Sequence, residues 1–235
     1  MNYKQITLSE DSTHFLINNK KAFGKTFREA LKFHVSGYAP VCDETGWYHI
    51  NTKGEASYKQ RYSRAFGYYF ERAAVVENGS WYHIKTKGQR LYDENYAWCG
   101  NYQEKLCTVR DFEGNYFHID IEGKRTYIEN YSYAGDFKDG YAAVRLKNGL
   151  YKHIDYQGKD LNGKLFNDLG VFHKNFATAK DESGWFHIDK KGNELYSQRY
   201  TMIEPYYNGF SLVEEFSGQK IIINELGKKT ILNNK

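Results

Sequence analysis

The stretch Gly46-Trp47-Tyr48-His49-Ile50-Asn51-Thr52-Lys53-Gly54 recurs along the chain with few changes. Clear copies occupy residues 80–88 and 184–192, shorter copies 116–123 and 151–158, and worn copies 14–20 and 220–227. The isoleucine in each copy recurs at steps of 33 to 35 residues, at Ile17, Ile50, Ile84, Ile119, Ile154, Ile188 and Ile223. A fixed period of this size indicates tandem supersecondary units and overrides the domain count that 235 residues would otherwise suggest.

Each copy is predicted to form a three-stranded antiparallel meander. Segments such as 141–144 alternate apolar residues, which is typical of a strand, and an acidic residue and a glycine then make a turn, as in 43–46. The Trp-Tyr-His-Ile segment is the second strand. A second turn, such as Lys53-Gly54, leads to a predicted third strand through Tyr58, Tyr92, Tyr127 or Tyr196.

The connections between meanders carry apolar residues three apart, as in Tyr131, Ala134 and Phe137. This spacing fits either one helical turn or a compact loop, and the sequence leaves both open. The first connection, 26–33, is the most helix-like, since Thr26 and Glu29 make a possible capping box. A short helix is therefore predicted there.

The predicted fold is all-β, with about seven tandem meanders in one continuous domain, 1–235. Ile6 and Leu8 stand where Ala73 and Val75 stand in a later copy, so the chain opens at a first strand, and 229–232 closes it at a third. Because no unit is shared between the termini, we expect an open, curved array with worn copies as caps; the alternative is a seven-bladed propeller-like ring. The predicted units are approximately 4–33, 34–67, 68–101, 102–136, 137–171, 172–205 and 206–235.

Composition narrows the possible partners and compartments. The net charge of +4 is spread over mixed Lys, Glu and Asp, which favours neither nucleic-acid nor membrane binding. The N-terminal segment lacks an apolar core of signal-peptide length, so a cytoplasmic location is expected. The three cysteines, Cys42, Cys99 and Cys107, lack metal-ligand spacing and are predicted to be reduced thiols, the last two as small buried residues.

Two columns of repeated side chains are the candidate ligand-binding residues. One is a set of imidazoles at His49, His83, His118, His153 and His187, and the other is a set of rings at Trp47, Trp81, Tyr116, Tyr151 and Trp185. The imidazoles are open to interpretation as metal or proton-responsive sites, but we favour a structural role, since equivalent residues on neighbouring strands lie too far apart to share an ion. The rings would stack on sugars or bases if exposed, and would form the core if buried.

No motif for nucleophilic, metal-dependent or phosphate-binding chemistry occurs, and no unit departs from the others in a way that suggests an asymmetric active site. The sequence therefore predicts a protein that is not an enzyme and that uses no cofactor and no metal.

The residues quoted above resemble the bacterial WG-repeat family, whose units combine a Gly-Trp-x-x-Ile-Asp-x-x-Gly core with a Gly-[Leu or Tyr]-Ala-x-Val strand. Here these elements are Gly46 to Asn51 with its copies, and 140–144. The Trp-[Tyr or Phe]-His-Ile-Asp version, with 110–112 and 203–209, is similar to a repeat segment found before a methyltransferase domain in some bacterial proteins. The resemblance spans nearly the whole chain, and it implies a binding or scaffolding module without an assigned activity.

Three functions follow as expectations. The leading one is a non-catalytic repeat scaffold that binds another macromolecule, for which we expect a protein, across an extended surface. The second is binding of a carbohydrate or small ligand by the aromatic column. The weakest is an accessory module of a methyl-transfer system.

Overall fold

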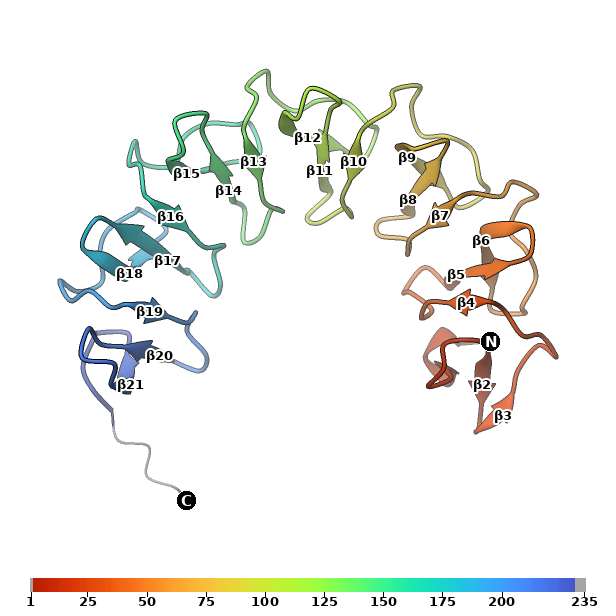
Figure 1. Cartoon of the computed structure of the whole chain (residues 1–235), viewed down its shortest axis with the longest axis horizontal. Coiled ribbons are helices and arrows are strands. Elements are labelled where there is room, and N and C mark those ends of the chain that lie inside the picture. The colour runs from red at the N-terminus through yellow and green to blue at the C-terminus, as the bar shows by residue number, and fades with distance from the viewer. Residues whose placement is uncertain (1, 231–235) are drawn as a thin grey trace. The chain divides into compact units, whose positions relative to one another are not determined.

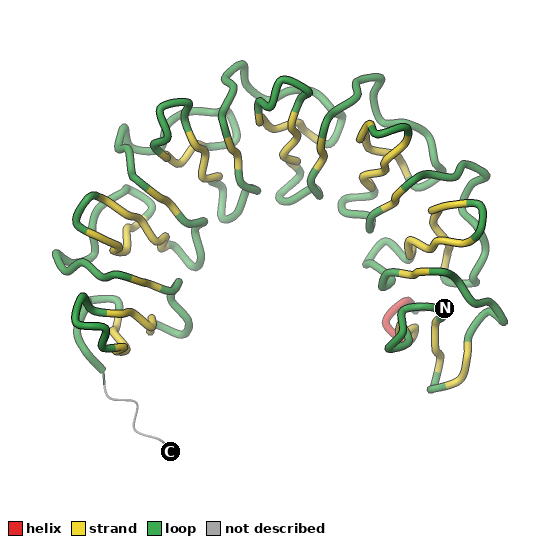
Figure 2. The backbone as a smooth tube through the Cα atoms, in the orientation of Figure 1, coloured by secondary structure: helices red, strands yellow, loops and turns green. Residues whose placement is uncertain are grey.

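The computed structural model describes residues 2–230, and within them the chain is all-β. Twenty-one strands form seven separate three-stranded antiparallel sheets, as predicted. The only helix among the described residues is a single 3-10 turn, η1 (Tyr3–Gln5), coloured red in Figure 2. None of the described residues belongs to a helix with the length and apolar character needed to cross a membrane.

The chain divides into two compact units, each described here by itself. Unit 1 comprises Met1–Gly114 and His118–Arg125, and unit 2 comprises Asn115–Phe117 and Thr126–Lys235. Unit 1 holds the first three sheets and part of the fourth: β1 (Ile6–Leu8), β2 (Phe15–Ile17), β3 (Lys20–Lys21); β4 (Glu29–Ala30), β5 (Tyr38–Asp43), β6 (Gly46–Asn51); β7 (Arg64–Ala65), β8 (Arg72–Glu77), β9 (Ser80–Lys85); and β10 (Trp98–Cys99), β11 (Leu106–Arg110). The division passes through β12 (Tyr116–Asp120), which completes the fourth sheet.

Unit 2 holds the last three sheets, labelled in Figure 1. Their strands are β13 (Tyr133–Ala134), β14 (Ala142–Arg145), β15 (Tyr151–Ile154); β16 (Asp168–Leu169), β17 (Phe176–Asp181), β18 (Gly184–Asp189); and β19 (Met202–Ile203), β20 (Phe210–Glu214), β21 (Lys220–Asn224).

The predicted central hairpin is present in each of these sheets. In the third sheet β8 pairs with β9, with Ala74 opposite His83 and Glu77 opposite Ser80. The turn of the equivalent β5–β6 hairpin is held by Asp43, whose carboxylate accepts the Thr45 backbone N–H at 2.8 Å. This is the use of aspartate that the turn sequence indicates.

The predicted third strand is wrong in its position. The third strand of six sheets is the two-residue strand that precedes the hairpin, such as β7, which pairs Ala65 with Val75. The segment after the second turn makes only isolated bridges, Ile84 with Arg90 and Trp81 with Tyr96. Extra residues between the two bridges break the ladder, as in a β-bulge. Of the proposed closing strand 229–232, Lys229 bridges Ile223, and 231–232 lie outside the described residues.

The connections between sheets are extended rather than helical. Tyr96 bridges Trp81 of its own sheet, and two residues later β10 pairs with β11 of the next sheet. One extended segment therefore joins successive sheets. The predicted helix over 26–33 is also wrong, since this region contains β4.

The helix-like spacing of apolar residues in 26–33 reflects side chains that are buried from an extended segment. Phe27, Ala30 and Phe33 are all buried, but the Phe27 N–H donates to Thr13 O and the Leu31 N–H to Pro40 O. The backbone N–H groups of this segment thus donate to the 12–13 turn and to β5 rather than to carbonyls four residues earlier in the segment.

Successive sheets also meet through a ring that covers a glycine. Gly88, in the second turn of the third sheet, has φ +80°, and a Cβ at this position would lie 2.7 Å from the Tyr58 ring of the preceding repeat. Gly123 faces Tyr92 in the same way, and in unit 2 Gly158 faces Tyr127 and Gly227 faces Tyr196. The glycine is required both for the turn and for the close approach of the ring.

We predict that Gly88→Ala destabilises the protein more than Gly79→Ala. Gly79 has φ +76°, but no atom lies within 4 Å of its would-be Cβ, so its substitution adds only backbone strain of about 1 kcal/mol. Gly88→Ala adds a clash with Tyr58, which costs about 1–3 kcal/mol more. Urea unfolding of the two variants measures the difference. Equal losses would show that Tyr58 moves aside freely.

Candidate functional site

The five repeated histidines are buried in the core. Their exposed fractions are 0% for His49 and His83, 1% for His118 and His187 and 3% for His153. Each lies on the second long strand of its sheet, with its side chain facing inward. A ligand in solution therefore has no access to these rings in this structure, so they do not form a binding surface.

Three of these imidazoles, those of His49, His83 and His187, bond to their own repeat on one side and to the following connection on the other. The Tyr92 hydroxyl donates to His83 Nδ1 at 2.6 Å, and His83 Nε2 donates to the Gly100 carbonyl at 3.0 Å. The same pair of bonds joins His49 to Tyr58 and Phe66, and His187 to Tyr196 and Glu204. A carbonyl only accepts, so Nε2 carries the proton and Nδ1 is left as the acceptor for the tyrosine.

Burial makes these imidazoles neutral at physiological pH. Desolvation lowers the pKa of His49, His83, His153 and His187 to about 4, although the carbonyl bonded to Nε2 opposes this shift. Within residues 2–230 no three His, Cys, Asp or Glu side chains are grouped closely enough to hold a metal ion.

The fifth repeat departs from the pattern, contrary to the uniformity expected from the sequence. His153 Nε2 donates to the Gly170 carbonyl at 2.9 Å, but Nδ1 is buried and has no hydrogen-bond partner among the described residues. Asn162 stands nine residues after His153, where the other repeats place a tyrosine. The shorter side chain leaves this imidazole without its hydroxyl donor.

The aromatic column is covered to different degrees. Trp47 is 5% exposed, with the Arg64 guanidinium 4.0 Å from its ring centroid. Trp81 is half-buried and stacks on Phe66, with ring centroids 5.1 Å apart. Tyr116, Tyr151 and Trp185 are also half-buried. The column therefore packs mainly against its neighbours, and four of its five residues stay partly exposed.

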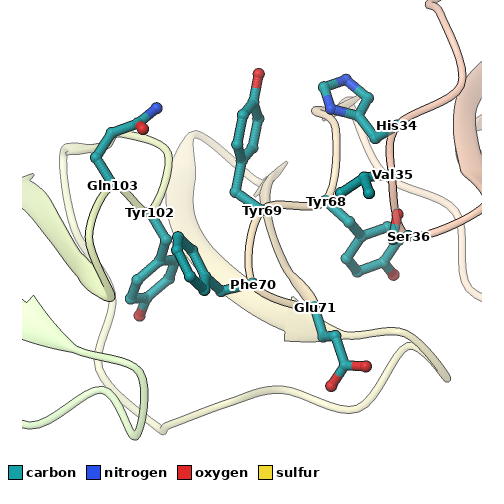
Figure 3. A pocket seen from close by; sticks show the side chains of 9 residues that line it. All are labelled: His34, Val35, Ser36, Tyr68, Tyr69, Phe70, Glu71, Tyr102 and Gln103. Atoms are coloured by element: carbon teal, nitrogen blue, oxygen red, sulfur yellow. The ribbon is translucent and has the colours of Figure 1, made fainter.

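A pocket lies elsewhere, at three successive turns of unit 1. It has a volume of about 520 Å³ and is lined by residues of the turns that precede β5, β8 and β11 (Figure 3). The lining residues are His34, Val35, Ser36, Tyr68, Tyr69, Phe70, Glu71, Tyr102 and Gln103. We call this cavity the turn pocket.

The turn pocket has an aromatic wall and an open rim. Tyr68 and Tyr102 are almost fully buried, whereas Phe70 is 46% and Val35 78% exposed. The His34 ring meets Tyr69 edge-to-face at 4.9 Å, and burial lowers the pKa of His34. The Ser36 hydroxyl is buried without a hydrogen-bond partner among the described residues.

A polar pocket adjoins the turn pocket through Glu71. It is lined by Arg72, Lys85, Thr86, Lys87, Gln89 and Glu122 as well. Arg72 donates to the Phe70 carbonyl at 2.7 Å and to the Ile121 carbonyl at 2.9 Å, and lies 3.9 Å from Glu122. Arg72 is therefore engaged in holding the turn that carries Phe70.

The repeat alignment alone did not reveal the turn pocket, because its residues lie outside the Trp-Tyr-His-Ile core. One signal was present. The two-residue turn before the hairpin reads Asp139-Gly140, Lys174-Asn175 and Asn208-Gly209 in unit 2 and Glu104-Lys105 in unit 1, and it carries an aromatic ring only at Phe70-Glu71.

We predict that stability falls between pH 6.5 and pH 4. The folded pKa of these histidines, about 4, lies below the unfolded value of about 6.5, so the unfolded chain binds more protons in this window. The contribution of the neutral histidines to the free energy of unfolding is fully present above pH 6.5. As the pH falls toward 4, each histidine lowers this free energy by up to about 1.4 kcal/mol per pH unit. His83→Gln should flatten the pH dependence of the urea-unfolding free energy. A profile parallel to that of the wild type would mean that His83 binds protons equally in both states.

We also predict that Asn162→Tyr stabilises the protein by about 1 kcal/mol, because a hydroxyl donor would reach the buried Nδ1 of His153. Gly192 of the next repeat faces residue 162, so the new tyrosine ring would pack against a glycine, as Tyr58 packs against Gly88. The control is Asn162→Phe, which supplies the ring without the hydroxyl. Urea unfolding compares them, and equal stability of the two variants would contradict a role for the bond.

Comparison with known proteins bears on family and fold. The model of the WG containing repeat matches residues 128–151 and 185–215. No curated protein matches the chain. Among solved structures, BamB from Moraxella catarrhalis is 12% identical with a TM-score of 0.52, over 97% of this chain and 86% of that chain.

A second solved structure gives a likeness of the same level. KlHsv2 with loop 6CD replaced by a Gly-Ser linker is 9% identical with a TM-score of 0.51, over 89% of this chain and 84% of that chain. At these identities the likeness, to β-propeller-like proteins, concerns fold alone. The matches support a WG-repeat relationship, with repeats of this kind at two places in an all-β fold of successive small sheets.

Proposed function

We propose that this protein is a non-catalytic repeat module that binds a partner protein through the turns of unit 1. The observation that carries the proposal is the turn pocket, which three consecutive repeats build at equivalent positions. Its rim carries Val35 and Phe70, apolar side chains that are 78% and 46% exposed. Exposed apolar residues beside a cavity are typical anchoring points for a partner.

The chemistry of the core supports a role without catalysis. The five repeated histidines are buried, and burial raises the pKa of the Cys99 thiol to about 12. A thiol with such a pKa is protonated at neutral pH and is a poor nucleophile. We place this binding role in the cytoplasm, where the reduced state of Cys42, Cys99 and Cys107 would be kept.

Carbohydrate binding is the second candidate, and one observation favours it. Phe66 and Trp81 lie nearly parallel, with 18° between their planes, and both are half-buried. Sugar rings stack on such surfaces. We prefer the protein partner because the turn pocket is a formed cavity, whereas these two rings cover one another.

We predict that Val35→Glu removes partner binding whereas Leu226→Glu does not. Both residues are strongly exposed, 78% and 68%, so neither change should affect folding, but only Val35 lines the turn pocket. Affinity capture with wild type and both variants, followed by measurement of Kd for the captured protein, tests this.

The outcomes separate the candidates. A loss of affinity of at least tenfold in Val35→Glu alone supports the proposal. Equal binding by all three proteins would overturn it. If tryptophan fluorescence then changed on addition of glycans, carbohydrate binding would take its place.

A further inference from the structure

The turn pocket contains a turn whose sequence is unfavourable for its backbone. Phe70 and Glu71 have φ +49° and +62°, the left-handed region that favours Asn, Asp and Gly. The corresponding turns in unit 2 include Asp139-Gly140 and Asn208-Gly209. Glu104-Lys105 and Lys174-Asn175 take the same positive φ at the equivalent place, so the backbone strain is shared, and what distinguishes Phe70-Glu71 is that it alone among these five turns carries an aromatic ring.

The walls of the turn pocket are rings. Figure 3 shows Phe70 beside Tyr102, Tyr69 between this pair and His34, and Tyr68 below Val35. The faces of phenyl and phenol rings carry partial negative charge and attract cations. When a cation leaves water for a pocket it loses hydration free energy. Several aromatic rings offset more of this loss than aliphatic side chains do.

The polar groups of the turn pocket fit a cation too. Glu71 has neither a hydrogen bond nor an ion pair within the described residues, although it lines both this pocket and its polar neighbour. The buried Ser36 hydroxyl, also unpartnered among them, offers an acceptor oxygen at the apolar end. Glu71 is the one acidic residue of the lining, which includes no lysine or arginine.

We propose that the turn pocket binds a cationic side chain, a lysine or arginine of the partner protein, with its charge among the rings and against Glu71. This inference rests on the proposed function, since it names the chemistry of the partner at the same site. A cavity of about 520 Å³ is within the range of specific ligand pockets and holds such a side chain. An acidic side chain would meet Glu71 with like charge, and an uncharged one would gain nothing from it.

The test uses simple probes on the whole protein. Tetramethylammonium is compared with tert-butanol, an uncharged molecule of similar shape, and the amide of N-acetyllysine with that of N-acetylnorleucine. Binding is followed by titration with NMR observation of the aromatic resonances. We expect the charged member of each pair to bind at least tenfold tighter.

Three variants locate the effect. Glu71→Gln removes the charge and keeps the shape, and Phe70→Gly removes the ring while suiting the positive φ of the turn. Each should weaken tetramethylammonium binding at least fivefold. Glu182→Gln is the control, because Glu182 is exposed and lines neither pocket, and it should leave binding unchanged.

The results also distinguish this inference from the proposed function. Equal binding of tetramethylammonium and tert-butanol, or an unaffected Glu71→Gln variant, would overturn the cation preference even if Val35→Glu abolishes partner capture. If acetylation of partner lysines and blocking of its arginines leave capture intact, the inference also fails. Cation binding at the turn pocket with no effect of Val35→Glu on capture would instead contradict the proposed function alone.

Discussion

The buried imidazole that joins two repeats is the interaction on which the rest of the structure depends. The His83 ring accepts a hydrogen bond from the Tyr92 hydroxyl of its own repeat. It donates one to the Gly100 carbonyl, in the connection that enters the next sheet. Because a three-stranded sheet of this size has little core of its own, it depends on its neighbours for burial. The imidazole fixes the spacing at which that burial takes place, and it does so only in its neutral form.

The sequence predicted the parts of the fold that local chemistry determines. The hairpins follow from alternation and from turn residues such as Asp43 and Gly46, and the identity of the buried histidine is visible in the repeat itself. The third strand was misplaced because two residues, such as Arg64 and Ala65, are too few to produce an alternating pattern. Their pairing with β8 depends on the position of the next sheet, which no local pattern carries.

The turn pocket could not be predicted for the same reason, since it depends on how neighbouring repeats are placed. The repeated rings and imidazoles were the obvious residues, because repetition makes them conspicuous, but repetition here marks packing between sheets. The turn pocket arises from equivalent positions whose residue types differ between repeats, Phe70 and Glu71, brought next to Val35 and Tyr102 from neighbouring repeats. Only the aromatic residue in this turn, which the equivalent turns lack, is visible in the sequence. In a tandem array, specificity is located where one copy differs from the rest.

The ring that covers a glycine has a consequence for how such a chain changes in length. Four repeats place a tyrosine against a glycine of the repeat after them, as Tyr58 does with Gly88, while Phe23 and Asn162 take the tyrosine's place in the first and fifth repeats. Removal or duplication of a whole period therefore leaves every junction with a matched pair. A deletion of part of a period would set a ring against a residue with a Cβ. Gain and loss of copies should thus proceed in complete periods, and any copy can serve as a donor for another.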